Sequence, residues 1–186
     1  MNDRSLFMED DSEGNYGKEA MLDFQMSWLM RISTDKRYDN TKLGDISRYV
    51  VLNLLELDKR TDVVIKKVKV WKQRKRIDVI AEIEILVNGN NEQHLVVIED
   101  KIYHGFSKEQ LDKNSSVILN NYDNPPKVHY WLIYGNSEID SEKLKQVCRE
   151  AKPEWKPLWF YDVIGGELKR PIGNGIFDDF WVRKWV

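Results

Sequence analysis

Hydrophobic residues recur at helical spacing near the beginning of the chain. Between residues 15 and 32, apolar side chains follow one another at intervals of four, as at Tyr16, Ala20 and Phe24. A second pattern with the same period runs from residue 46 to residue 57. Because this period places the apolar side chains on one face of a helix, the sequence predicts two amphipathic helices that pack against each other.

Three extended segments follow these helices. Residues 62–73 are rich in β-branched and basic side chains, and residues 77–85 are mostly apolar with acidic residues between. The unbroken apolar run at residues 95–98 has the composition of a strand that is buried on both faces. An Asn-Gly-Asn-Asn cluster at residues 88–91 separates the last two segments and predicts a hairpin turn between them.

The second half of the chain alternates between helix and strand. Ser107 and Gln110 have the spacing of a helix capping box, which predicts a helix from there to about residue 120. The next strand is expected at residues 128–134, and the intervening helix makes a parallel crossover the natural connection. The remaining patterns predict a helix at 141–151, a short strand at 158–161 and an aromatic-rich segment at 177–185. These elements predict an α/β fold with a mixed central sheet of about four to five strands flanked by helices.

Candidate chemistry lies where the 95–98 run ends, at Glu99, Asp100 and Lys101. Side chains alternate along a strand, so Glu99 and Lys101 project from one side of the sheet, roughly 7 Å apart at the base, and Asp100 from the other. If the two strands pair across the hairpin, Asp78 lies near the end that carries Glu99. Two carboxylates and an amine at strand ends suit a hard divalent cation. The competing interpretation is a structural ion pair, which is harder to reconcile with charges that follow a buried strand.

This arrangement resembles the PD-(D/E)XK nuclease superfamily. Its motif is an acidic residue on one strand and (D/E)-X-K at the end of the next, matched here by Asp78 and by residues 99–101. The flanking residues and the Gln110-Leu111 pair on the following helix are also similar to that family. In the branch that has a glutamine on this helix a tyrosine often follows four residues later, where this chain has Asn114. The resemblance covers roughly residues 15–134.

The resemblance implies a restriction-endonuclease-like core and metal-dependent hydrolysis of DNA phosphodiester bonds. Asp78 and Glu99, with the backbone carbonyl of Asp100, would hold Mg²⁺ or Mn²⁺, and Lys101 would orient or help deprotonate the attacking water. Glu19, on the first predicted helix, matches an accessory acidic residue of some family members.

Two questions stay open on the sequence alone. Gln110 either contacts substrate or reaches back to the backbone of Ser107 as part of the capping box. The alternative to a nuclease is a catalytically inactive module on the same fold that binds nucleic acid or a protein partner.

Positive charge is concentrated in one segment of the chain. The net charge of the whole chain is −2, but residues 59–76 hold nine basic residues and the single acidic residue Asp62. Such a run suits contacts with phosphate groups, whereas the simpler interpretation is an edge strand that lysines protect from aggregation. Together with Gln110, the basic residues predicted to contact substrate are Lys67, Lys69, Lys72, Arg74 and Arg76.

Length and composition bound the remaining possibilities. The 186 residues, 41% of them hydrophobic, predict one domain at residues 15–186 after a disordered acidic arm at residues 1–14. The single cysteine and the lack of a long apolar span or secretory signal predict a soluble protein of the cytoplasm with no membrane partner. DNA is the expected partner, and a homodimer or larger complex stays open. The scattered His94, His104 and His129 argue against a zinc site.

Overall fold

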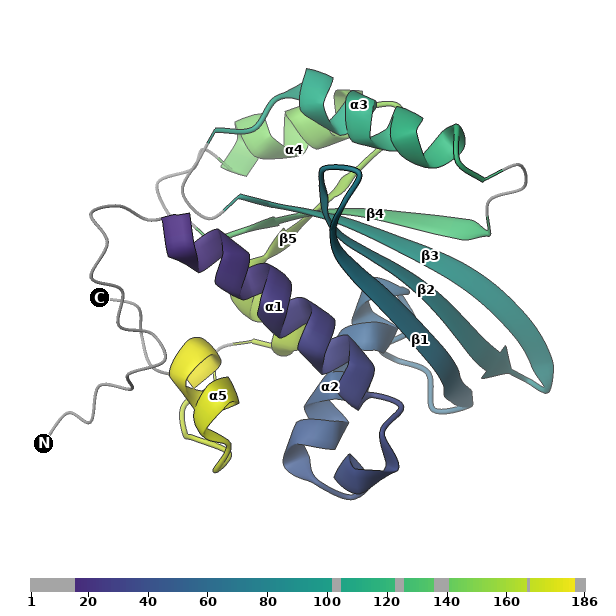
Figure 1. Ribbon diagram of the computed structural model, residues 1–186, viewed down its shortest axis with the longest axis vertical. Coiled ribbons are helices and arrows are strands. Elements are labelled where there is room, and N and C mark those ends of the chain that lie inside the picture. Colours follow the sequence, from purple (N-terminus) through teal and green to yellow (C-terminus); the bar gives the residue numbers. More distant parts are fainter. Residues whose placement is uncertain (1–15, 102–104, 123–125, 136–140, 167, 183–186) are drawn as a thin grey trace, which may run out of the picture.

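The computed structural model describes residues 16–101, 105–122, 126–135, 141–166 and 168–182, with side chains described from residue 20 onward. Five strands form one open sheet in chain order (Figure 1). The first three strands pair antiparallel and the last three pair parallel, so the sheet is mixed, as predicted. The strands are β1 (Val63–Arg74), β2 (Ile77–Val87), β3 (Asn90–Lys101), β4 (Lys127–Tyr134) and β5 (Lys156–Trp159).

Helices cover both faces of the sheet (Figure 1). On one face lie α1 (Tyr16–Ile32) and α2 (Lys42–Leu54), and on the other lie α3 (Lys108–Leu119) and α4 (Ser141–Glu150). Short helical turns complete the described chain: Lys36–Tyr38, Phe160–Ile164, α5 (Gly175–Phe177) and a π-helical turn at Asp178–Val182. In the part of the chain that the structure describes, no helix is both long enough and apolar enough to cross a membrane.

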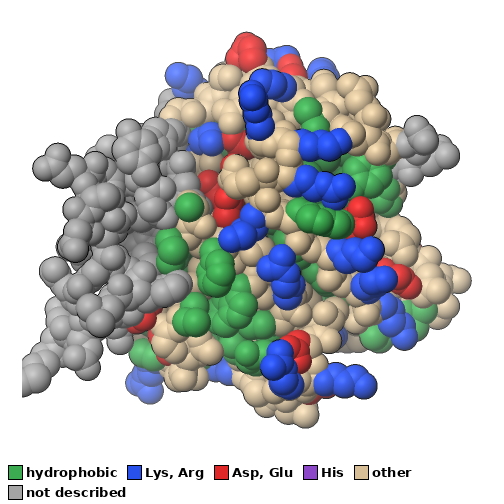
Figure 2. Space-filling view, in the orientation of Figure 1, with side chains coloured by type: hydrophobic (Ala, Val, Ile, Leu, Met, Phe, Trp, Pro, Cys, Tyr) green, Lys and Arg blue, Asp and Glu red, His purple; other side chains and the backbone are tan. Residues whose placement is uncertain are grey.

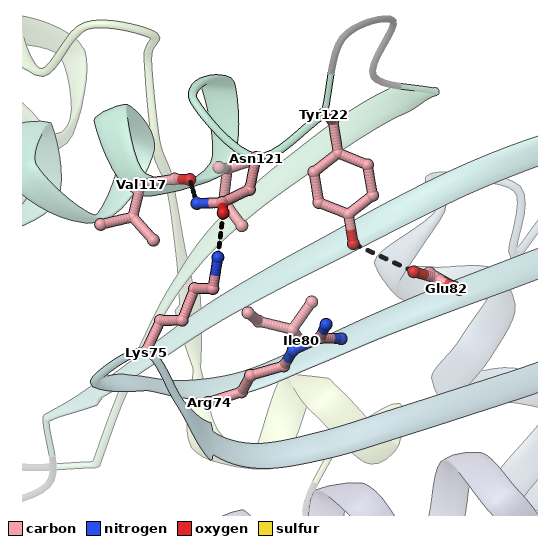
Figure 3. Close-up of a pocket in the computed structure, with 8 residues that line it drawn as sticks. Arg74, Lys75, Ile80, Glu82, Val117, Asn121 and Tyr122 are labelled. Carbon is pink, nitrogen blue, oxygen red and sulfur yellow. Dashed lines mark hydrogen bonds between the residues drawn. The ribbon is translucent and has the colours of Figure 1, made fainter.

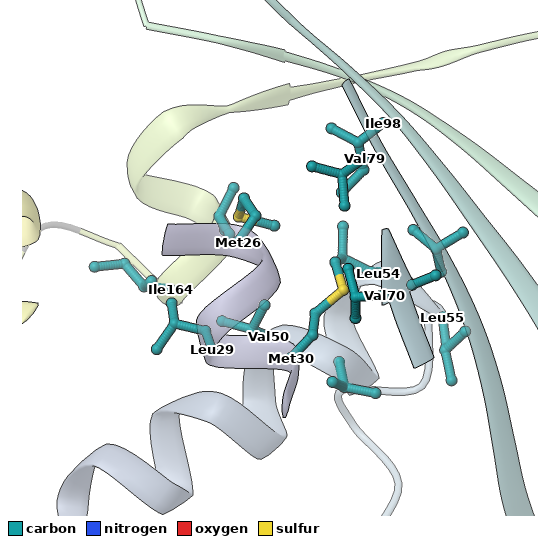
Figure 4. Close-up of a cluster of buried hydrophobic side chains, with 14 of the residues drawn as sticks. Met26, Leu29, Met30, Val50, Leu54, Leu55, Val70, Val79, Ile98 and Ile164 are labelled. Atoms are coloured by element: carbon teal, nitrogen blue, oxygen red, sulfur yellow. The ribbon is translucent and has the colours of Figure 1, made fainter. Parts of the chain in front are cut away.

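Two hydrophobic clusters fix the orientation of β3. One cluster joins the sheet to α1 and α2 and includes Met26, Leu54 and Ile98 (Figure 4). The other joins the sheet to α3 and α4. Successive residues of β3 enter opposite clusters, so Val96 and Ile98 face α1 whereas Leu95 and Val97 face α3. This alternation determines the direction in which each residue beyond Ile98 projects.

The hairpin between β2 and β3 is tighter than the sequence pattern suggested. Val87 pairs with Asn90, which leaves Asn88 and Gly89 as a two-residue turn. Both have positive φ angles, 50° and 80°, as the turn geometry requires, and Asn and Gly are the residues that adopt this conformation most readily. Pairing therefore begins at residue 90, and β3 is longer than its apolar core predicts.

The end of the sheet differs from the prediction in position. The strand expected at residues 158–161 is β5, which ends at Trp159. Phe160 begins a 3₁₀ turn because its ring leaves the sheet to stack on Trp181, with centroids 4.5 Å apart. Trp155 and Trp181 are fully buried, so both side chains pack in the interior of the protein. The predicted acidic arm at residues 1–14 lies outside the described residues.

Candidate functional site

The sheet brings Asp78 and Glu99 to the same end and the same face. The last pair of the β2–β3 ladder joins Val79 to Ile98, and one further step of this antiparallel register places Asp78 opposite Glu99. The Asp78 Oδ2 atom accepts a hydrogen bond from the backbone N–H of Asp100 at 2.9 Å. The antiparallel ladder thus juxtaposes the two carboxylates that the sequence proposed as partners.

Glu99 is the most enclosed carboxylate of the group, with 1% of its surface exposed. Its Oε1 atom lies 2.7 Å from the Lys101 Nζ atom and also accepts from the side-chain amide of Gln110, while Oε2 accepts from Asn114 Nδ2 at 2.8 Å. Burial, and next the negative charge of Asp78, raise the pKa of Glu99 to about 7, although Lys101 acts in the opposite direction. Enclosure and the neighbouring charge of Asp78 therefore both disfavour the ionised form of Glu99.

Helix α3 supplies two amides to Glu99. Gln110 and Asn114 are four residues apart and so lie on one face of the helix, directed at the same carboxylate. The backbone N–H of Gln110 donates to the Ser107 hydroxyl at 3.3 Å, which caps the helix, but its side chain reaches Glu99 and not Ser107. Asn114, at the position where the resembling branch has tyrosine, is a site residue that the sequence did not identify. Its spacing of four residues from Gln110, which places both side chains on one face of the helix, could have identified it.

Asp23 is a second residue that the sequence analysis missed. It projects from α1 toward the opposite face of β3, where it lies in side-chain hydrogen-bonding contact with Asp100 and is 4% exposed. Burial is the largest influence on its pKa, which is raised to about 6, and hydrogen bonds with Asp100 and Gln73 act in the lowering direction. Four acidic residues consequently meet at this end of the sheet, two on each face.

Gln73 links the two faces. Its Nε2 atom donates to Asp23 Oδ2 at 2.7 Å and to Asp78 Oδ1 at 2.9 Å, passing around the end of the sheet at the edge of the β1–β2 hairpin. Its backbone has φ 49°, in the left-handed region that costs a non-glycine residue on the order of 1 kcal/mol. Lys75 and Arg76, at the tip of the same hairpin, also have positive φ angles, 58° and 68°. No sequence motif marks Gln73, because its role depends on this turn.

The donor atoms fit a hard divalent cation in part. The carboxylate oxygens of Asp78, and Oε2 of Glu99, each accept one hydrogen bond and keep a second lone pair, whereas Oε1 of Glu99 already has two donors. Within the described ranges, no group of three or more His, Cys, Asp or Glu side chains has a geometry ready to hold a metal ion. Waters would have to complete the coordination shell, as is usual for Mg²⁺. The side chain of Glu19 lies outside the described part, and the Asp100 carbonyl stays a prediction.

The basic residues of β1 do not share one face. The strand lies at the edge of the sheet, and Figure 2 shows lysine and arginine side chains gathered over its exposed side. Lys67 and Lys69 are exposed on the α3 face, and their cross-strand partners are Glu84 and Glu82. These glutamates offset part of the positive charge there.

The other basic residues lie closer to the carboxylates. The Lys72 Nζ atom lies 5.0 Å from the centre of the Phe24 ring on α1, and its charge acts on Asp23. Arg74 lies over the Trp71 ring at 4.4 Å, and Arg76 is exposed at the hairpin tip. The residues predicted to contact substrate are thus divided between two faces and the tip that joins them.

His94 and His129, which look scattered in sequence, form a buried pair. The Nδ1 atom of His94 and the Nε2 atom of His129 are 3.0 Å apart, and each ring is flanked by a glutamate, Glu92 at 3.2 Å and Glu56 at 3.5 Å. Burial lowers the pKa of both imidazoles, that of His129 to about 4. The pair lies near the middle of β3, because His94 precedes Glu99 by five residues and the parallel register aligns His129 with Val96.

Comparisons of the chain with protein-family models, curated proteins and solved structures found no match. The residues of this chain are therefore the basis for a functional assignment.

Proposed function

We propose that the protein is a metal-dependent nuclease that hydrolyses DNA phosphodiester bonds. The observation that carries the proposal is the convergence of Asp78, Glu99 and Lys101 on one face at one end of the sheet, with Lys101 Nζ 2.7 Å from Glu99 Oε1. Two carboxylates face one ammonium group, and burial, followed by the negative charge of Asp78, raises the pKa of Glu99 to about 7. A purely structural ion pair does not need the second carboxylate, whereas a cation site does.

Asp78 and Glu99 would hold Mg²⁺ or Mn²⁺. A bound ion of this kind lowers the pKa of a coordinated water and offsets the charge of phosphate oxygens. Gln110 and Asn114 fix the Glu99 carboxylate from α3, and Gln73 fixes Asp78 from the hairpin. The acidic residues are thus oriented by neighbours before any ligand arrives, which is the usual requirement for a catalytic site.

Lys101 is the candidate for the group that meets the reacting phosphate. Its side chain is 13% exposed, so the ammonium is largely enclosed but reachable, and it cannot itself bind a metal ion. Placed beside the carboxylates, it would orient the attacking water and stabilise negative charge that develops on the phosphate. The basic residues of β1 and its hairpin would contact the phosphates of the same DNA.

The second candidate is a catalytically inactive module that binds nucleic acid. The exposed lysines and arginines along β1 favour it independently of the carboxylates. It predicts DNA binding without hydrolysis, and binding that does not respond to changes at Asp78.

Cleavage assays separate the two candidates. Linear, circular and single-stranded DNA are incubated with the protein in Mg²⁺, Mn²⁺ or EDTA. The nuclease proposal predicts products with a divalent ion, none with EDTA and none from an Asp78→Asn variant that keeps its fold by circular dichroism. DNA that is bound but intact under every condition would support the binding module instead.

A further inference from the structure

A pocket lined by both apolar and charged side chains lies beside the candidate site on the α3 face of the sheet. It has a volume of about 190 Å³ and is bounded by the β1–β2 hairpin and the C-terminal part of α3 (Figure 3). Pockets that enclose a whole drug-sized ligand are larger, roughly 300–1,000 Å³. This one suits a single ring system whose remaining atoms stay outside.

The lining combines three kinds of chemistry. Ile80 and Ile118 are buried and form an apolar floor. Glu82 lies at one end, where its Oε1 atom accepts a hydrogen bond from the Tyr122 hydroxyl at 3.0 Å (Figure 3). Arg74, from the hairpin, brings a positive charge to the rim. A ligand that matches all three has a flat apolar body, hydrogen-bond donors on one edge and an anionic group outside, which describes a nucleotide.

Glu82 decides which base fits. An ionised carboxylate accepts hydrogen bonds and donates none, so it selects an edge with N–H groups. Guanine presents two adjacent donors, its ring N–H and its exocyclic amine, which can bond the two carboxylate oxygens together. Adenine and cytosine place an acceptor nitrogen beside their amine, and uracil and thymine flank a single N–H with two carbonyls. Tyr122 holds the carboxylate in place and leaves lone pairs on both oxygens.

We propose that this pocket binds one unpaired guanine of a nucleic-acid strand, with the flanking phosphates on Arg74 and Lys75. Both basic side chains are exposed at the hairpin that also carries Gln73, so a strand seated here passes directly beside the carboxylate site. Lys75 is oriented toward the pocket by a hydrogen bond to Asn121 at the end of α3 (Figure 3). The inference rests on the proposed function for its substrate class, but the recognition of guanine depends on the Glu82 carboxylate that Tyr122 positions, and not on the metal site.

Calorimetry in EDTA tests base recognition without any cleavage. Guanosine and uridine monophosphates are titrated into wild type, Glu82→Gln and Glu84→Gln, the last being a matched change two residues away on the same face of β2. Wild type and Glu84→Gln should bind guanosine monophosphate at least about tenfold more tightly than uridine monophosphate. Glu82→Gln should bind the two nucleotides with the same affinity. Tyr122→Phe removes the hydrogen bond that holds the Glu82 carboxylate, so it should reduce the preference for the guanine nucleotide. Equal affinities for the two nucleotides, or a preference that survives in Glu82→Gln, would overturn the inference.

A second titration distinguishes a strand from a free nucleotide. A thymidine hexamer with one central guanine should bind more tightly than guanosine monophosphate, because it offers extra phosphates to Arg74 and Lys75, and this advantage should shrink as salt is added. A mononucleotide that binds as tightly as the hexamer would refute a strand as occupant. EDTA is present in both titrations, so they do not depend on cleavage. Guanine selectivity in a protein that cleaves no DNA in the separate assay would refute only the nuclease proposal. Cleavage by a protein without guanine selectivity would refute only the guanine pocket.

Discussion

Replacing Glu99 by glutamine should make the folded protein more stable at alkaline pH while removing a candidate metal ligand. The residue is 1% exposed, and Asp78 adds like charge, so ionised Glu99 is disfavoured in the folded state. Glutamine has nearly the same shape and carries no charge. One of its polar atoms still accepts from Lys101 or Gln110, and the Asn114 amide can turn over to meet the new NH₂ group.

The size of the effect follows from the pKa of Glu99. That pKa is raised from 4.5 to about 7, so between these values the folded state holds a proton that the unfolded state has released. Wild-type stability from this group is therefore fully present below pH 4.5 and is lost as the pH rises to 7. The loss is on the order of 3 kcal/mol, since each pH unit corresponds to about 1.4 kcal/mol. The Glu99→Gln variant does not lose this stability, because glutamine does not titrate.

Guanidinium unfolding at pH 5, 6, 7 and 8, without divalent ions, measures this directly. The free energy of unfolding of Glu99→Gln minus that of wild type should grow by about 2–3 kcal/mol from pH 5 to pH 8. Glu84→Gln is the matched control, because it makes the same chemical change on β2 at a position that is only half-buried. Titrations elsewhere in the protein cancel in the difference. If that difference is the same at all four pH values, the pKa of Glu99 is not raised in the folded protein.

Three further predictions concern other parts of the molecule. Mg²⁺ titrated by calorimetry should bind wild type, and the Asp78→Asn variant should have a much lower affinity for the ion. Equal affinities would show that Asp78 is not a metal ligand. Replacing Lys67, Lys69 and Lys72 together by glutamine should make the binding constant for DNA less dependent on salt. The slope of log K against log salt should fall by a little under about one unit for each phosphate contact that is lost. An unchanged slope would mean that β1 is a solvated edge strand that does not bind DNA. The lowered pKa of His129, about 4, means that the unfolded state binds a proton first as the pH falls, so stability should decrease from pH 6.5 to 4. His129→Gln should reduce this acid sensitivity in urea titrations, and an identical pH profile would contradict the assignment.

The parts of the fold that were predictable are those set by local periodicity. Alternation along β3 placed Glu99 and Lys101 on one face and Asp100 on the other, and the contacts with α3 and α1 agree with this. Asp78 was paired with Glu99 correctly because a short hairpin fixes antiparallel register.

The residues that were missed depend on packing between distant segments. Asp23 reaches Asp100 only because α1 crosses that face of the sheet, and a helix period does not reveal where a helix lies on a sheet. Gln73 depends on a left-handed backbone angle that nothing in a basic strand announces. His94 and His129 meet because a parallel crossover sets the register between β3 and β4, and the sequence predicts the crossover but not its register.

Lys101→Ala distinguishes a hydrolytic centre formed by Asp78, Glu99 and Lys101 from a structural ion cluster of the same residues. An ammonium group is no metal ligand, so this variant should keep its fold, its DNA binding and its affinity for Mg²⁺, which can even rise when a nearby positive charge is removed. The rate of DNA cleavage in Mg²⁺ should fall about a hundredfold or more, because the group that orients water and meets transition-state charge is gone. Lys145→Ala, which removes an exposed lysine paired with Glu142 on α4, should cleave at the wild-type rate. A variant that unfolds on losing Lys101, together with a wild type that cleaves no DNA in Mg²⁺ or Mn²⁺, would show that the three residues form a structural ion cluster.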